Sequence, residues 1–290
     1  MENNLIPGEN KAEGAHLSFW RYLVTIILVV GAMIMAQIGL FGVAYAIEGN
    51  LDIMAYPPIT LLWLSMLPFG AALVVLLLSV RFIHKLSIKS IFSGHQHFQW
   101  KTLFYSALLW FGLAAISDIV LSLLQPGNYQ FVFNAGTFIP FLLVSLLLIP
   151  IQISAEETFF RGYLQPAFAR VTKLWWVAIL LQAALFGLLH GANTEVSEYG
   201  ILTTMPFYIG IGILLGLITY RFNGLEAALG LHLANNLYAS IAVTFAGSSI
   251  ESPALFVIKN YQPVAALVVF AITAVIYFLM MDFILKKNGN

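Results

Sequence analysis

The sequence contains no cysteine among its 290 residues, and only 9% of its residues are charged. The lack of cysteine excludes disulfides, thiolate metal ligands, a cysteine nucleophile and thioether lipid anchors. Soluble domains carry about 25% charged residues, so a chain this poor in charge needs lipid around its outer face. The formal net charge is zero. Because no basic excess marks an electrostatic footprint, we expect no nucleic-acid partner.

Apolar residues dominate instead, at 60% of the chain. A membrane-spanning α-helix needs roughly 20 consecutive apolar residues. Eight such runs occur, at approximately 22–47, 59–80, 102–124, 137–157, 174–192, 203–220, 225–246 and 263–285. The first run is too long for the core of a cleavable signal peptide. We therefore predict an all-α polytopic membrane bundle of about eight transmembrane helices, with one membrane domain over 1–290 and a polar N-terminal tail at 1–20.

The basic residues alternate along the chain in a way that predicts the orientation. In an eight-span arrangement, 12 of the 13 Lys and Arg residues, Lys11 and Arg161 included, fall on one side, and only Lys259 falls on the other. Basic residues concentrate in cytoplasmic loops, so we predict that both termini are cytoplasmic. The short loops favour a multi-pass protein of a bacterial plasma membrane. Residues 84–100, which mix basic and apolar types, are compatible with an interfacial helix or with a hydrated loop.

Ionisable groups inside membrane spans are costly and are candidates for function. Glu156 and Glu157 end the fourth run, and Arg161 follows four residues after Glu157. On one continuous helix Glu157 and Arg161 can form an ion pair. Glu156 is rotated by about 100° from its neighbour, which leaves it as the carboxylate available for chemistry. Alternatively, both glutamates simply cap a cytoplasmic helix end.

The fifth run contains His190, with Phe186 one turn before it on the same helix face. Alone, such a histidine can be a hydrogen-bonding contact between helices. We expect the turn between the fourth and fifth runs near 171–175. Glu156 and His190 are each 17 residues from position 173, so in an antiparallel hairpin they would lie at similar depth.

The seventh run contains His232 and Asn236 on one helix face, while Asn235 points away. Two polar side chains on one stripe of an apolar span suggest a lined cavity, although interhelical hydrogen bonding is the alternative. On the predicted boundaries His232 lies only about six residues into its span. It should therefore be shallower than Glu156, and the sequence does not resolve this conflict.

One carboxylate, two imidazoles and an amide suit peptide hydrolysis, which needs an activated water, an oxyanion donor and a proton for the leaving amine. Glu156 is the natural general base, His190 could orient the water, and His232 with Asn236 could donate to the oxyanion. No metal cofactor is favoured. The alternative is a zinc site, because two histidines and one glutamate with an open fourth position form a catalytic zinc set; its ligands would be Glu156, His190 and His232.

These residues resemble the motifs of a known family. Glu156-Glu157-x-x-x-Arg161, Phe186-x-x-x-His190 and His232-x-x-x-Asn236 look like the three motifs of the CAAX-protease and bacteriocin-processing (CPBP or Abi) intramembrane peptidases, over a core of about 138–245. The resemblance implies an eight-helix fold and a cavity that admits a peptide. It further implies Glu156 and His190 as water activators, His232 and Asn236 as the oxyanion site, and Glu157, Arg161 and Phe186 as supporting residues.

We therefore expect an intramembrane endopeptidase that cleaves a membrane-associated or lipidated protein or peptide. A non-catalytic membrane scaffold or bacteriocin-immunity factor of the same fold is the alternative, and a proton-coupled transporter is a third hypothesis. Asp118 has no predicted catalytic role, and we expect it to pair with a polar group in another span. Gly212-x-x-x-Gly216 in the sixth run predicts close helix packing.

Overall fold

The computed structural model describes residues 17–249 and 252–287 of the chain. Eleven α-helices and three short strands make up its named elements. The helices are α1 (Phe19–Glu48), α2 (Pro58–Phe82), α3 (Ile88–Phe92), α4 (Trp100–Leu124), α5 (Ala135–Glu157), α6 (Gln165–Thr172), α7 (Trp175–Leu189), α8 (Thr194–Tyr199), α9 (Ile201–Arg221), α10 (Glu226–Ile241) and α11 (Pro263–Lys287). A π-helical segment, Thr158–Leu164, joins α5 to α6, and 3₁₀ turns cover Ile53–Ala55 and His190–Ala192.

The all-α polytopic prediction is confirmed. In the described part of the chain, seven helices are long and apolar enough to cross a membrane, and the α5–α6 unit is a continuous 38-residue span, Ala135–Thr172. The segment predicted at 225–246 instead ends as a helix at Ile241, after 16 residues. Sixteen residues give about 24 Å of helix, less than the roughly 30 Å hydrocarbon core. This helix, α10, can nevertheless lie in the bundle because it packs against α4, α5 and α9 rather than lipid.

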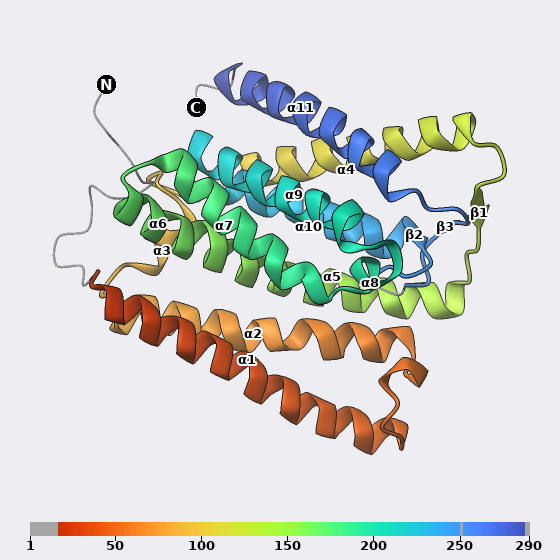
Figure 1. Cartoon of the computed structure of the whole chain (residues 1–290), viewed down its shortest axis with the longest axis horizontal. Coiled ribbons are helices and arrows are strands. Elements are labelled where there is room, and N and C mark those ends of the chain that lie inside the picture. The colour runs from red at the N-terminus through yellow and green to blue at the C-terminus, as the bar shows by residue number, and fades with distance from the viewer. Residues whose placement is uncertain (1–16, 250–251, 288–290) are drawn as a thin grey trace.

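The long helices lie side by side and alternate in direction, so the start of α1 and the end of α11 lie at the same end of the bundle (Figure 1). We call this the basic end, since it carries Arg21, Arg81, Lys85, Lys89, Lys101, Arg170, Lys173, Arg221, Lys286 and Lys287. Lys259 follows β3 at the opposite end. The prediction that Arg161 lies in a loop was wrong, because this residue is buried in the bundle and only 1% exposed. Lys11 and most of the predicted tail at 1–20 lie outside the described residues.

The end opposite the basic end carries a small sheet that the sequence did not predict (Figure 1). Its strands are β1 (Tyr129–Phe131), β2 (Val243–Phe245) and β3 (Phe256–Ile258), in the order β1-β3-β2. The pair β1–β3 is antiparallel, and the pair β2–β3 is parallel. Three-residue strands are too short to show the alternation that identifies a strand in a sequence. We call this end of the bundle the sheet end.

The segment 84–100 forms the short helix α3 and a turn at the basic end. Ser93 forms a β-bridge with Gly224, and the His95 ring contacts the Phe222 carbonyl at 2.9 Å. The turn therefore packs on the α9–α10 connection, which explains why this segment is more ordered than a hydrated loop. His97 is exposed.

Candidate active site

A buried ion pair lies at the centre of the site. The Arg161 guanidinium donates to Glu157 Oε1 at 2.9 Å, and neither side chain has any exposed surface. Arg161 also lies 4.5 Å from the centre of the Phe186 ring, with its cationic group over the aromatic face. The pairing predicted from the four-residue spacing is therefore present. It satisfies both charges where neither can reach water.

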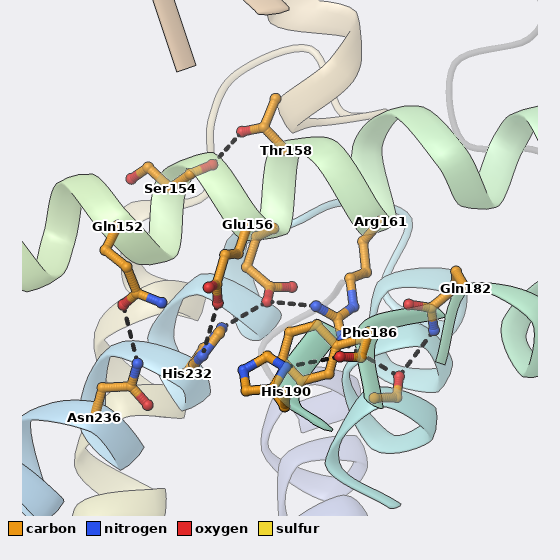
Figure 2. Close-up of polar contacts among 12 residues, drawn as sticks. Gln152, Ser154, Glu156, Thr158, Arg161, Gln182, Phe186, His190, His232 and Asn236 are labelled. Atoms are coloured by element: carbon orange, nitrogen blue, oxygen red, sulfur yellow. Dashed lines mark hydrogen bonds and ion pairs between the residues drawn. The ribbon is translucent and has the colours of Figure 1, made fainter. Parts of the chain in front are cut away.

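Glu157 has a second partner, which the sequence did not reveal. His232 Nδ1 lies 2.7 Å from the same Glu157 oxygen that binds Arg161. Because a carboxylate that pairs with arginine is an acceptor, the imidazole must donate through Nδ1–H. This contact fixes the ring so that Nε2 lies on the side of Glu156, 3.6 Å from its Oε2 atom (Figure 2). His232 is thus held between the two adjacent glutamates, which removes the conflict over its depth.

The backbone around these residues is a π-helix, not the α-helix assumed for residues after Glu157. The wider turn covers Thr158–Leu164 and ends two residues before Pro166. Proline has no N–H and clashes with the carbonyl four residues earlier, so an ordinary α-helical turn is disfavoured there. Single π turns occur frequently at functional sites, where they re-aim side chains. Here the segment begins directly after the two glutamates.

The glycines of α9 allow polar side chains to reach its backbone. Gly212 O accepts from Gln182 at 2.9 Å and from Arg161 at 3.4 Å, while Gly216 O accepts from Gln165 at 3.2 Å. A Cβ atom at Gly212 would lie 3.0 Å from the backbone of Ala183. The Gly-x-x-x-Gly pattern therefore does mark close helix packing, as predicted, and it also serves the buried ion pair.

His190 lies at the end of α7, directly after the last α-helical turn. Its Nδ1 contacts the Phe186 carbonyl at 2.7 Å, and its ring stacks on Tyr208 with centroids 4.6 Å apart. Since a carbonyl only accepts, Nδ1 carries the proton, and neutral His190 presents an Nε2 lone pair. The chain turns between α6 and α7 at Lys173, which has a left-handed φ of 58°. This position agrees with the turn expected near 171–175.

Glu156 and His190 line the same cavity, in agreement with similar depth across the hairpin. Among the described residues, however, no hydrogen bond or ion pair joins these two side chains. The direct partner of Glu156 is His232. Any chemistry shared by Glu156 and His190 would therefore need a molecule between them.

Asn236 belongs to a chain of amides (Figure 2). Its Nδ2 donates to Gln152 Oε1 at 3.0 Å, and its Oδ1 accepts from Asn235 at 3.2 Å. Asn235 in turn accepts from the Trp110 indole at 3.2 Å, so it does not simply point away from the site. Gln152 was missed because only ionisable groups were sought within the spans. An uncharged amide one helical turn before Glu156 was the available signal.

A cavity of about 920 Å³ is lined by Glu156, His190, His232, Asn236 and Gln152, among others. This volume lies within the usual range for sites that bind small molecules or short peptide segments. Within residues 17–249 and 252–287, no three His, Cys, Asp or Glu side chains are grouped to hold a metal ion.

The bundle and its buried polar centre define a multi-pass integral membrane protein with a lipid-facing surface. Residues 135–238 match the family described as type II CAAX prenyl endopeptidase Rce1-like. The chain is also 30% identical over 256 residues to "Uncharacterized protein YyaK" of Bacillus subtilis (strain 168), with 85% of each chain covered. No solved structure matches. The chain belongs to the Rce1-like CAAX protease family, within the CPBP group, and the matched segment contains every predicted site residue.

Proposed function

We propose that this protein is an intramembrane endopeptidase that hydrolyses a peptide bond of a membrane-associated or lipidated protein through a water activated by Glu156. The observation that carries the proposal is the placement of His232 between Glu157 and Glu156, at 2.7 and 3.6 Å. This arrangement gives one carboxylate facing a cavity and an imidazole whose orientation is fixed. The family supports a protease activity.

The net charge of the buried groups bears on the protonation of the His232–Glu156 pair. Glu156, Glu157 and Arg161 together carry one net negative charge when the glutamates are ionised. The scheme places one proton on the His232–Glu156 pair, which brings the total charge of the buried groups to zero. With this proton on Nε2, His232 is a donor directed at the space beside Glu156.

The hydrolysis then proceeds with every proton accounted for. A water bound between Glu156 and the His190 Nε2 lone pair attacks the peptide carbonyl carbon, and Glu156 takes its proton. The resulting oxyanion accepts from His232 Nε2–H and from the Asn236 N–H that Gln152 does not use. Glu156 returns its proton to the leaving nitrogen as the C–N bond breaks, giving one carboxylic acid terminus and one amine.

No step in this scheme passes through a metal. The scheme therefore expects cleavage to persist after treatment with a chelator. Loss of activity on chelation, restored by Zn²⁺, would overturn the metal-free mechanism.

The test is cleavage by purified protein in nanodiscs of a fluorescence-quenched peptide library whose members carry a C-terminal lipid or an apolar anchor. Glu156→Gln removes the base while keeping the shape, and we expect a loss of about 10²–10⁴-fold in rate. Glu198→Gln, an exposed glutamate on α8, is the matched control and should cleave as wild type does. Equal cleavage by wild type and Glu156→Gln would contradict the role proposed for Glu156.

A further inference from the structure

The cavity beside Glu156 extends toward the sheet end of the bundle. Its lining continues from Glu156 along α4 to Asn128 and Tyr129, and then to Ser249 and Tyr261 near the sheet. In the other direction lie the buried Glu157–Arg161 pair and the Gln165 and Gln182 contacts with α9. A molecule that reaches Glu156 through this cavity therefore does not pass the buried ion pair, and it can enter from the sheet end or beside α1, where exposed Val30 and Ile34 line the cavity.

Away from the catalytic residues, the charged groups that line the cavity have one sign. Besides Glu156 the lining includes the carboxylates of Asp118 and Glu195, whereas no Lys or Arg of the described residues lines the cavity. Clefts with a single sign of charge and low-dielectric walls concentrate ions of the opposite sign. Part of the remaining wall is apolar, with Met33 and Phe69 from α1 and α2. The cavity thus suits a segment that combines apolar groups with a positive charge.

The two outer carboxylates are held in place by neutral donors. Asp118 accepts from Tyr129 at 2.6 Å and from Tyr238 of α10 at 2.7 Å, which is the predicted pairing with another span. Glu195 accepts from the Ser249 amide at 2.8 Å and from Tyr208 at 3.3 Å. In the described part of the chain, neither forms an ion pair with a basic side chain. Neither carboxylate is therefore paired with a cation among the described residues.

The pKa values of two tyrosines outside the membrane spans are raised, first by burial and then by these carboxylates. Burial, together with the hydrogen bond to Asp118, raises the pKa of Tyr129 above its usual range. Burial, followed by the nearby Glu195 carboxylate, raises the pKa of Tyr261 to about 12. Both phenols remain protonated at neutral pH, so neither supplies a charge, and Tyr129 orients Asp118 by its hydrogen bond.

The inner end of the cavity provides an independent indication of a ligand. Glu156 is only 7% exposed and lies in the cavity wall, and its Oε2 atom makes no hydrogen bond among the described residues, since His232 Nε2 lies 3.6 Å away. A buried carboxylate oxygen without a donor is costly. A bound N–H or O–H group would remove that cost.

We propose that the cavity admits a peptide segment bearing Lys or Arg from the sheet end, and that Asp118 and Glu195 select it by charge. This inference rests on the proposed peptidase function for its purpose. If the basic end is cytoplasmic, the segment enters from the outer face of the membrane, and anionic segments are rejected.

Access can be measured without a substrate, because the chain has no cysteine of its own. Ala239→Cys places a single thiol in the cavity wall, and Val171→Cys places one on an exposed site at the basic end. We expect a membrane-impermeant thiol reagent to modify the first in intact cells and the second only after permeabilisation. Modification of Ala239→Cys only after permeabilisation would overturn the proposed route.

Charge selection is tested with two methanethiosulfonate reagents, one carrying trimethylammonium and the other sulfonate. The ratio of their rates at Ala239→Cys should exceed the ratio at the exposed Thr137→Cys by about tenfold or more. Asp118→Asn and Glu195→Gln should each lower this excess, and together they should abolish it. Tetralysine should slow modification by the cationic reagent, whereas tetraglutamate should not. Equal ratios at positions 239 and 137 would overturn the selection.

The outcome is separable from that of the proposed function. Modification of Ala239→Cys in intact cells should persist in a Glu156→Gln background, because access from the sheet end does not need the base. A protein that cleaves normally but labels from the basic end refutes only this inference. A protein that labels as expected but cleaves equally well with Glu156→Gln refutes only the peptidase mechanism.

Discussion

Glu157 contacts both Arg161 and His232, and these two contacts predict different effects of substitution. Arg161→Met keeps much of the side-chain volume but removes the cation. Removing one partner of a buried ion pair leaves an uncompensated charge, which typically costs about 3–5 kcal/mol. The second single substitution is Glu157→Gln, which removes the anion that pairs with Arg161. We expect either single substitution to lower the free energy of unfolding by about this amount.

The double variant separates stability from chemistry. Arg161→Met with Glu157→Gln has no unpaired charge on this pair, so its loss in stability should be smaller than the sum of the two single losses, by a coupling energy of about 1–3 kcal/mol. Activity should not recover. The new amide at position 157 would still accept from His232, but a neutral amide cannot stabilise the imidazolium as the carboxylate does. We expect cleavage to remain about a hundredfold or more below wild type.

The assay combines thermal unfolding in detergent with cleavage in nanodiscs for the wild type, the two single variants and the double variant. Arg161→Lys is the matched control, since it keeps the charge but not the geometry, and it should be intermediate in stability. Strictly additive losses of stability would show that the pair is not an energetic unit. Recovery of wild-type cleavage in the double variant would refute the role given to Glu157.

Three further predictions follow from single contacts. Gln152→Leu should lower the cleavage rate by about tenfold or more with little effect on the melting temperature, because it frees the Asn236 amide to rotate; an unchanged rate would contradict this. Gly212→Ala should destabilise the fold by about 1–3 kcal/mol, since its Cβ would press on Ala183, whereas Gly31→Ala, with no atom within 4 Å, should not. His190→Phe should keep the stacking on Tyr208 but abolish cleavage, as measured in the same library.

The sequence was sufficient for the outline of the bundle because its strongest signals are long-range and repetitive. Apolar runs and alternating basic connections follow from the cost of burying charge in lipid, and they located the helices to within a few residues. The same reasoning failed for Arg161, which was assigned to a loop although it is buried. A helix that continues past the membrane-spanning length, as α5 and α6 do, gives no charge signal at the place where it crosses the boundary.

The site was predictable in its parts and not in its contacts. Separation of Glu156 from Glu157 followed from helix geometry, and the Arg161 pair is present. That His232 bridges both glutamates depends on the depth of α10, a helix too short to be placed by span length alone. The link from Gln152 to Asn236 joins positions 84 residues apart, and no local pattern can indicate such a pairing.

The parallel contacts between the α5–α6 unit and α9 bear on how related chains can differ in length. Arg161 reaches Gly212 and Gln165 reaches Gly216, and each contact joins positions 51 residues apart. Adding or deleting one residue within 161–165 or 212–216 would shift one contact relative to the other by about 100° around its helix axis. An insertion or deletion in the connection at 190–200 changes the number of residues between the two helices. It leaves the Arg161–Gly212 and Gln165–Gly216 contacts in register with each other. Insertions should therefore accumulate in that connection and be absent from the two five-residue segments.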